Sequence, residues 1–415
     1  MSFSASRGPS AQVADLAEAI AVLKPTILYR IDIQTLTLDG HVTPEGTKKF
    51  AERSVKGESA LGSHFRTFES LSLGSLGIGT YLGDPDAYTD QLVEEAVFTS
   101  LKSGVINVID TAINYRSQRG ERSVGRALQR LAREGVVKRE EVFLASKNGY
   151  VTNDGELPMD IWTYIHREFV KPGILKPDEI GAEMHSTSVP FLKAQFERSL
   201  RNLGVGALDL MYLHNAGEAW LREIGIRRFL ERLEAVFSYY EEERRRGRLK
   251  YYGLATWNSF RVPNSHPEHL NLDDVVDVAR NVGGGDHGFR FIQLPLNLGM
   301  TEAFTRNQRM MDDQLSVLEA AERLGVGIFT SAPLDHGRLL SADYQKEGYT
   351  RSGFLLQFPR SAHPSVIAPL VGHKQPEHVT ENLKIGSVPP LSGSEFSRTY
   401  GSFLEGGRGS AGGRS

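Results

Sequence analysis

The stretch Ile106-Asn107-Val108-Ile109-Asp110-Thr111-Ala112-Ile113-Asn114-Tyr115 decides the fold. It begins as a short apolar run, typical of a buried strand, and ends in an acid and a phenol. Two later apolar runs end in the same way: Lys147 follows residues 142–146, and His214 follows residues 208–213. A parallel barrel gathers the carboxyl ends of its strands on one face, where barrel enzymes have their active sites. The sequence therefore predicts that these four polar side chains meet.

Strand-like and helix-like segments alternate from about residue 66 to residue 386, which favours a (β/α)8 barrel of the α/β class over an open sheet. The expected strands are residues 75–81, 106–109, 142–146, 208–213, 251–256, 291–294, 327–331 and 367–371. The expected helices are residues 90–103, 120–134, 189–203, 229–247, 272–281, 313–324 and 376–384. Several helical patterns close on a glycine, where a left-handed cap is wanted: Gly104, Gly135, Gly204, Gly247 and Gly325.

Three zones follow from this pattern. Residues 1–65 form an N-terminal extension, with a helix expected over 13–23 and a weak strand over 27–38. Residues 66–386 form the barrel, and its long connections over 148–188, 215–228 and 334–361 are expected to be loops, of which at least one shapes a binding site. Residues 387–415 are rich in Gly, Ser and Pro and predict a tail that is partly disordered.

Composition limits the class of protein. The 415 residues are 40% hydrophobic and 24% charged with a net charge of −3, so neither nucleic acid nor an anionic membrane is expected as a partner. The absence of cysteine excludes disulfides and cysteine-bound metals. No apolar run approaches the roughly 20 residues of a membrane helix, and the first residues lack a secretory signal. A cytoplasmic location is expected.

The four strand-end residues suit the reduction of a carbonyl group, which needs a proton on oxygen while carbon takes a hydride. Tyr115 is the expected proton donor, but a free phenol has a pKa of about 10. A nearby Lys147 ammonium is expected to lower that pKa, and Asp110 to keep the ammonium charged and in place. His214 is expected to donate to the carbonyl oxygen and orient it.

Six segments resemble, in order, the landmarks of the aldo-keto reductases. They are Leu76-Gly77-Ile78-Gly79-Thr80-Tyr81, Asp110 to Tyr115, Gly120-Glu121-Arg122-Ser123-Val124-Gly125-Arg126-Ala127-Leu128, Ser199-Leu200-Arg201-Asn202-Leu203-Gly204, Asp209-Leu210-Met211-Tyr212-Leu213-His214, and Gly372 with Lys374 to His378. The resemblance covers residues 67 to 385. It implies an oxidoreductase that uses NADP(H), with NAD(H) possible, to reduce a small-molecule aldehyde or ketone. The catalytic residues it implies are Asp110, Tyr115, Lys147 and His214.

The resemblance also implies a cofactor site across the barrel mouth, with Lys374 near an adenosine 2′-phosphate. Gly77-Ile78-Gly79 is not a dinucleotide fingerprint, because no helix opens there. The chain departs from the family at Ala255 and Thr256, and at Ser331, where an aromatic residue usually stacks on nicotinamide. The implied cofactor residues are Gly79, Thr80, Asp110, Thr256, Gln293, Ser331, Pro333, Leu334, Gly372, Lys374, His378, Glu381 and Asn382.

The substrate pocket is expected to have aromatic walls, contributed by Tyr81, Trp162, His185, Trp220 and Trp257. An alternative reading is a non-catalytic, reductase-like subunit that binds nucleotide in a regulatory role. A metal-dependent hydrolase is disfavoured because the first strand lacks a His-x-His pair, so no metal is expected. The oligomeric state stays open.

Overall fold

The computed structural model describes residues 37–342, 344, 346 and 348–406 of the 415-residue chain. The chain divides into two units, Met1–Thr37 and Leu38–Ser415, and every element described below belongs to the second. The helix expected over 13–23, and nearly all of the strand expected over 27–38, lie outside the described residues.

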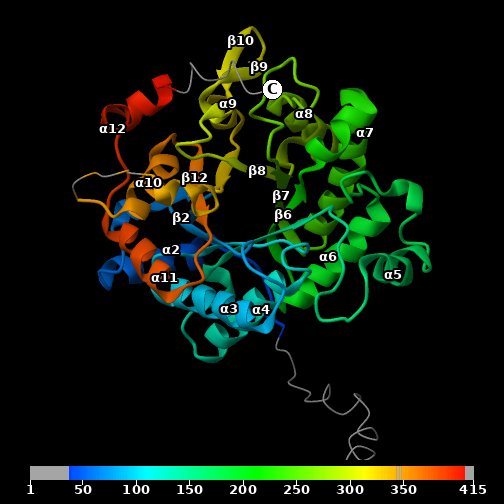
Figure 1. The fold of residues 1–415 in the computed structure, drawn as a ribbon, viewed down its shortest axis with the longest axis horizontal. Coiled ribbons are helices and arrows are strands. Elements are labelled where there is room, and N and C mark those ends of the chain that lie inside the picture. The colour runs from blue at the N-terminus through cyan, green and yellow to red at the C-terminus, as the bar shows by residue number, and fades with distance from the viewer. Residues whose placement is uncertain (1–36, 343, 345, 347, 407–415) are drawn as a thin grey trace, which may run out of the picture. The chain divides into compact units, whose positions relative to one another are not determined.

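Eight parallel strands close into a barrel with helices around it (Figure 1). The order around the barrel is β3-β4-β5-β6-β7-β8-β11-β12, which closes back on β3. Each strand overlaps one of the predicted eight, so the predicted (β/α)8 barrel is confirmed. The bounds are β3 (Gly77–Gly79), β4 (Val108–Asp110), β5 (Phe143–Asn148), β6 (Leu208–His214), β7 (Leu249–Ala255), β8 (Phe289–Pro295), β11 (Gly327–Ser331) and β12 (Val366–Val371).

The seven predicted helices are present, with two differences. The fourth, α7, begins at Ala216 instead of residue 229 and turns at Gly225, whose φ of 73° breaks the helical path. The sixth, α9, begins only after Ser316, because Ser316 and Glu319 form a capping box there. The bounds are α3 (Ala87–Lys102), α4 (Arg119–Arg133), α6 (Val189–Leu203), α7 (Ala216–Arg245), α8 (Leu272–Gly283), α9 (Val317–Leu324) and α11 (Pro376–Leu383).

Further elements fill the connections, the extension and the tail, and one hairpin strand takes residues 313–316, which had been predicted as the start of a helix. The larger ones are α2 (Pro44–Lys56), α5 (Ile161–Ile165), α10 (Arg351–Ser361), α12 (Gly393–Gly406), and the hairpins β1 (Phe65–Phe68) with β2 (Leu71–Gly74) and β9 (Arg306–Met310) with β10 (Asp313–Ser316). Short helical turns cover Gly62–His64, Arg139–Glu141, His166–Val170, Pro177–Glu179, Gly284–Asp286, Glu302–Phe304, Asp335–Ser341 and Lys384–Ser387.

The β1–β2 hairpin closes the amino-terminal end of the barrel. Leu71 and Leu73 are fully buried and join the cluster that fills the barrel interior. Phe68 packs against the interior ring of Phe291, with centroids 4.9 Å apart. The amide of Gly74 donates to Oδ1 of Asn107, just before β4, over 2.8 Å. The barrel interior is therefore accessible to a ligand from the carboxyl end of the strands.

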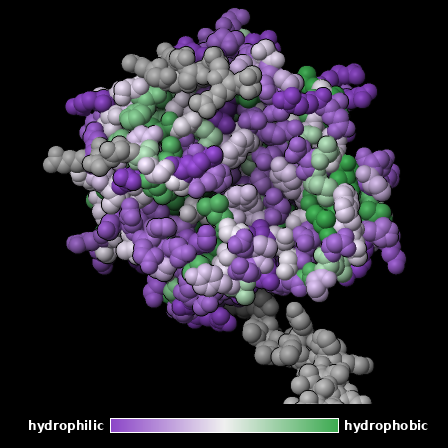
Figure 2. All heavy atoms as spheres, in the orientation of Figure 1, coloured by the Kyte–Doolittle hydropathy of each residue, from purple (hydrophilic) through white to green (hydrophobic). Residues whose placement is uncertain are grey.

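The segment after residue 386 is more ordered than its composition predicts. In α12, Phe396 and Tyr400 are buried against Phe358 of α10, and the Tyr400 hydroxyl donates to the Phe354 carbonyl over 2.6 Å. Residues 407–415 lie outside the described part. Figure 2 shows a largely hydrophilic face in this orientation, with apolar areas kept apart. Within the described residues, no helix has both the length and the apolar character needed to span a membrane.

Candidate active site

Three neighbouring strands carry the predicted tetrad to one place. Asp110 ends β4, Lys147 lies near the end of β5, His214 ends β6, and Tyr115 follows β4 in a tight turn. The Lys147 Nζ lies 2.5 Å from Oδ2 of Asp110 and 3.0 Å from the Tyr115 hydroxyl oxygen, and it donates to the Thr111 carbonyl over 2.9 Å. The ammonium thus donates its three hydrogen bonds to three acceptors, one of which is the Tyr115 oxygen. The phenolic proton of Tyr115 is left free to be donated elsewhere.

Burial sets the protonation states of this cluster. Burial lowers the pKa of Lys147 and raises that of Asp110, while the attraction between the two opposes both shifts. Burial raises the pKa of Tyr115 well above its usual value, and the Asp110 carboxylate adds to the rise. Burial and Asp110 therefore outweigh the lowering of the Tyr115 pKa that was expected from Lys147. Tyr115 stands as a protonated phenol across the neutral range.

His214 is held as a neutral imidazole. Its pKa lies well below the usual value because the ring is buried and the Lys147 charge is close. The ring lies edge-on to Tyr115, with centroids 5.9 Å apart, and its Nδ1 has no partner in the part of the chain that the structure describes. A neutral imidazole has one N–H donor, so His214 can offer a hydrogen bond without carrying charge.

One cavity of about 820 Å³ opens over these residues, within the range of about 300–1,000 Å³ of small-molecule and cofactor sites. Asp110, Tyr115 and His214 line it, and Lys147 lies behind Tyr115. All the residues that the family resemblance assigned to the cofactor also line it. They are Gly79, Thr80, Asp110, Thr256, Gln293, Ser331, Pro333, Leu334, Gly372, Lys374, His378, Glu381 and Asn382.

The cavity lining fits a nicotinamide dinucleotide. Four buried polar atoms in the lining have no partner among the described residues: Oδ1 of Asn114, Nδ1 of His214, Oγ1 of Thr256 and Oδ1 of Asn382. Such atoms are costly to bury unless a ligand or water pairs with them. Lys374, just before α11, and Arg351, at the start of α10, bring positive charge suited to phosphates. The lining thus offers both unpaired polar atoms and cations.

Two of the five predicted substrate residues line the cavity, Tyr81 and Trp257. The other three do not. Trp162 lies on α5 with 59% of its surface exposed, because the connection after β5 folds outward there. His185 and Trp220 are buried behind His214, where each satisfies the other's polar atom. The prediction that these three side chains touch the substrate is corrected accordingly.

Sequence reasoning missed several cavity residues, among them Tyr150, Asn215 and His336. Tyr150 follows Lys147 by three residues and the end of β5 by two, so its place just beyond a barrel strand was an available signal. Its ring stands perpendicular to the ring of His214, with centroids 5.0 Å apart. His336 has a left-handed φ of 54° and stacks on Trp257, 6.2 Å between centroids. No sequence pattern indicated that backbone or that stacking.

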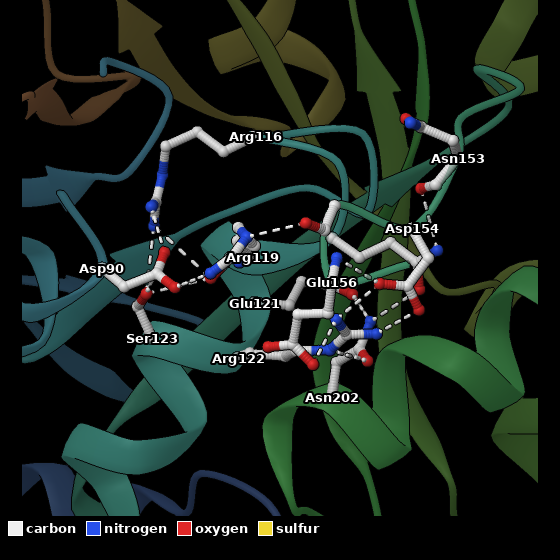
Figure 3. A network of polar contacts seen from close by, with 12 residues as sticks. Asp90, Arg116, Arg119, Glu121, Arg122, Ser123, Asn153, Asp154, Glu156 and Asn202 are labelled. Atoms are coloured by element: carbon white, nitrogen blue, oxygen red, sulfur yellow. Dashed lines mark hydrogen bonds and ion pairs between the residues drawn. The ribbon is translucent and has the colours of Figure 1, made fainter. Parts of the chain in front are cut away.

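The turn that carries Tyr115 is fixed by a network of charges (Figure 3). Arg116, Ser117 and Gln118 all have positive φ, which is uncommon for residues other than glycine. Arg116 and Arg119 each pair with one carboxylate oxygen of Asp90 on α3, and the Arg116 side chain is only 1% exposed. The turn, α3 and the start of α4 are thereby joined next to the phenol.

Across residues 37–342, 344, 346 and 348–406, no group of three or more acidic or histidine side chains is arranged to hold a metal ion. Asp110 instead accepts hydrogen bonds from Lys147 and from the side-chain amide of Gln293, the latter over 2.8 Å.

Known proteins share this fold. Over 357 residues, covering 81% of this chain and 93% of the relative, the sequence is 22% identical to an uncharacterized oxidoreductase, YqkF, of Bacillus subtilis. The glycerol dehydrogenase AKR11B4 of Gluconobacter oxydans superposes with a TM-score of 0.56 at 17% identity, covering 86% of this chain and 98% of that one. An aldo/keto reductase of Klebsiella pneumoniae, solved with NADP and acetate, gives 0.53 at 21% identity, covering 82% and 95%.

The sequence model of one family matches residues 75–283, just over half of the 415 residues. The match runs from the residues before β3 to the end of α8 and includes the strands that carry Asp110, Lys147 and His214. The chain therefore belongs to the aldo/keto reductase family of oxidoreductases.

Proposed function

We propose that this chain reduces an aldehyde or ketone to an alcohol with NADP(H), and that Tyr115 is the proton donor. The observation that carries the proposal is the contact of 3.0 Å between Lys147 Nζ and the Tyr115 oxygen, at the base of the cavity. With Lys147 donating to that oxygen, the phenolic proton is available to a substrate, and the same ammonium stabilises the phenolate that is left.

A bound reduced nicotinamide supplies the hydride for the carbonyl carbon. The protein's part is to place and polarise the carbonyl group. The N–H of neutral His214 donates to the carbonyl oxygen, and Tyr115 transfers its proton to that oxygen as negative charge develops there. Asp110 keeps the buried Lys147 charged through their contact of 2.5 Å. Solvent then restores the Tyr115 proton.

Two observations support a dinucleotide with an extra phosphate as the cofactor. Lys374 and Arg351 line the same cavity, and both are cations of the kind that bind phosphate. The Klebsiella pneumoniae relative was solved with NADP. NAD(H) remains the alternative cofactor, and a cytoplasmic location remains a prediction from the sequence.

A non-catalytic, nucleotide-binding subunit is the second candidate function. The family departures at Ser331 and Ala255 favour it, since both lie in the cavity without a ring to stack on nicotinamide. The intact cluster of Asp110, Lys147 and Tyr115 opposes it. Burying the Lys147 ammonium costs desolvation free energy, and a role in catalysis explains why the chain keeps it.

The test is a fluorescence titration with NADPH and NADH, followed by turnover on a panel of aldehydes and ketones. Tighter binding of NADPH and measurable NADPH oxidation on at least one carbonyl support the proposal. Binding of NADPH with no turnover across the panel would favour the regulatory candidate instead.

A further inference from the structure

Behind His214 lies a buried pair of rings that the proposed chemistry does not use. His185 is fully buried in the connection before α6, and Trp220 of α7 is 3% exposed. The Trp220 Nε1 lies 2.9 Å from Nδ1 of His185, and Nε2 of His185 lies 2.8 Å from the carbonyl oxygen of His214. A continuous chain of contacts therefore runs from α7 to the backbone of His214.

The chemistry of these groups fixes the direction of both hydrogen bonds. An indole N–H can only donate, so Nδ1 of His185 must accept from Trp220. Nε2 of His185 then carries the ring proton and donates to the His214 carbonyl, which can only accept. A single tautomer of a neutral imidazole satisfies both bonds. Burial holds His185 in the neutral state by lowering its pKa to about 4.

Two glycines leave space for the rings of His185 and Trp220. Gly149 has a φ of 116°, and a Cβ there would stand 2.4 Å from Nε2 of His185. A Cβ on Gly181 would stand 2.9 Å from Cη2 of Trp220. On the side of α7, the Arg232 guanidinium lies 4.1 Å from the centroid of the Trp220 ring. The two rings are thus confined, and their positions are set by packing as well as by hydrogen bonds.

The hydrogen bond from His185 fixes the carbonyl of one peptide group, and a second hydrogen bond fixes the amide of the same group. The carbonyl of His214 and the amide of Asn215 belong to the same planar peptide group. The Asn215 amide donates to the Ala255 carbonyl of β7 over 2.6 Å. Asn215 also has a left-handed φ of 46°. With both polar groups of the peptide fixed, the Cα of His214, and hence its ring, has a set direction.

We infer that His185, oriented by Trp220, is a positioning residue that holds the His214 ring against the substrate carbonyl. The inference rests on the proposed function, since it assigns His214 a role in carbonyl reduction. This role of His185 and Trp220 differs from the substrate contact that the sequence predicted for both residues. His185 acts through the backbone of His214 and touches neither substrate nor cofactor.

Kinetics of matched variants test the inference. His185→Leu keeps bulk and removes the donor, whereas His185→Gln keeps an N–H donor at about the position of Nε2. His185→Leu is expected to lower kcat by roughly 10- to 100-fold, since a shift of about 1 Å in a catalytic group has effects of that order. His185→Gln should recover most of that loss, and the dissociation constant of NADPH should not change in either variant. His166→Leu, at an exposed histidine of the same connection, is the control and should behave as wild type.

A double-mutant cycle separates positioning from general structure. In a His214→Phe background, His185→Leu should cause no further loss, because the residue through which His185 acts is gone. Losses that multiply, or a glutamine variant as impaired as the leucine variant, would overturn the inference. If His214→Phe reduces carbonyls as fast as wild type, His214 has no role in the reaction and the inference is overturned. If wild type itself turns over no carbonyl of the panel, the proposed function fails, and kinetics cannot report on His185.

A measurement without turnover decides the geometry in that case. Long-range ¹H–¹⁵N NMR of histidine-labelled protein reports the tautomer of each ring, and the signal missing from His185→Gln identifies residue 185. Wild type should show the Nε2–H tautomer at neutral pH. Trp220→Phe removes the donor to Nδ1 and should change the ¹⁵N shift of Nδ1, while Nε2 stays protonated because it still faces the His214 carbonyl. An Nδ1–H or doubly protonated His185 in wild type would contradict the arrangement.

Discussion

The ammonium of Lys147 and the phenol of Tyr115 face each other at 3.0 Å, and both side chains are buried beneath the cavity. The ammonium also lies 4.6 Å from the centre of the Tyr115 ring. A charged nitrogen in such a place is stable only with partners, which Asp110 and the Thr111 carbonyl provide. Lys147 donates a hydrogen bond to the Tyr115 oxygen, and an ammonium cannot accept one in return. The phenolic proton can therefore go to a ligand.

Tyr115→Phe should abolish carbonyl reduction and leave NADPH binding nearly intact. The variant keeps the ring and removes the proposed proton donor, and loss of general acid catalysis costs about 10²- to 10⁴-fold. Turnover on the fastest aldehyde of the panel and an NADPH titration measure the two effects. A phenylalanine variant that turns over like wild type would show that Tyr115 is not the donor.

Lys374→Ala should weaken NADPH and spare NADH. A charge-assisted hydrogen bond to a 2′-phosphate is worth about 1.5–3 kcal/mol, or roughly a 10- to 150-fold change in the dissociation constant. Lys384→Ala is the matched control, because Lys384 does not line the main cavity. Titrations with both cofactors check the prediction, and an equal loss for NADPH and NADH would refute the phosphate contact.

Asp90→Asn should destabilise the protein by about 3–5 kcal/mol, because it leaves the buried Arg116 cation without its carboxylate. The kcat should also fall, since the turn that carries Tyr115 loses its anchor (Figure 3). Asp154→Asn is the control: its pair with Arg122 is more exposed and should contribute about 1 kcal/mol. Urea unfolding measures both, and equal effects of the two substitutions would contradict the special role of Asp90.

The barrel and the cavity could be predicted because both follow from strand ends. Asp110, Lys147 and His214 each close an apolar run, and parallel strands must bring such ends to one face. The cofactor residues came from the resemblance to the aldo-keto reductases, whose motifs lie at or just after the ends of the barrel strands. Short local motifs were enough for these positions, whether they were read from the strand ends or through the family resemblance.

The long connections between strands and helices could not be predicted in this way, because contacts with residues distant in the sequence decide their structure. Trp220 looked like a loop residue, but α7 begins at Ala216 and buries it against His185. The segment that holds α10 was predicted to be part of a long loop, and its apolar residues are interrupted by Gly353 and Pro359. That helix is completed by the rings of α12, more than thirty residues later, a partnership that no local pattern reveals.

Acid should unfold wild type more readily than His185→Gln. The folded-state pKa of His185 is about 4, against 6.5 for an ordinary histidine. Between these values His185 is protonated in the unfolded chain and neutral in the folded chain. The free energy of unfolding therefore falls as the pH falls below about 6.5. The slope for one such group is about 1.4 kcal/mol per pH unit. Urea unfolding from about pH 7 to about pH 4.5 should show a shallower decline for the glutamine variant, and parallel curves would contradict the prediction.

Trp162→Ala and Trp257→Ala should separate the two aromatic walls that the sequence could not tell apart. Trp257 lines the cavity and stacks on His336, so its removal should raise KM for an aromatic aldehyde by the equivalent of roughly 1 kcal/mol, about five-fold. Trp162 is mostly exposed on α5 and does not line the cavity, so Trp162→Ala should keep the parent's KM and its ranking of substrates. A panel of aldehydes and ketones measures both variants. If Trp162→Ala changes the ranking, the connection after β5 closes over the cavity during turnover and reaches the substrate after all.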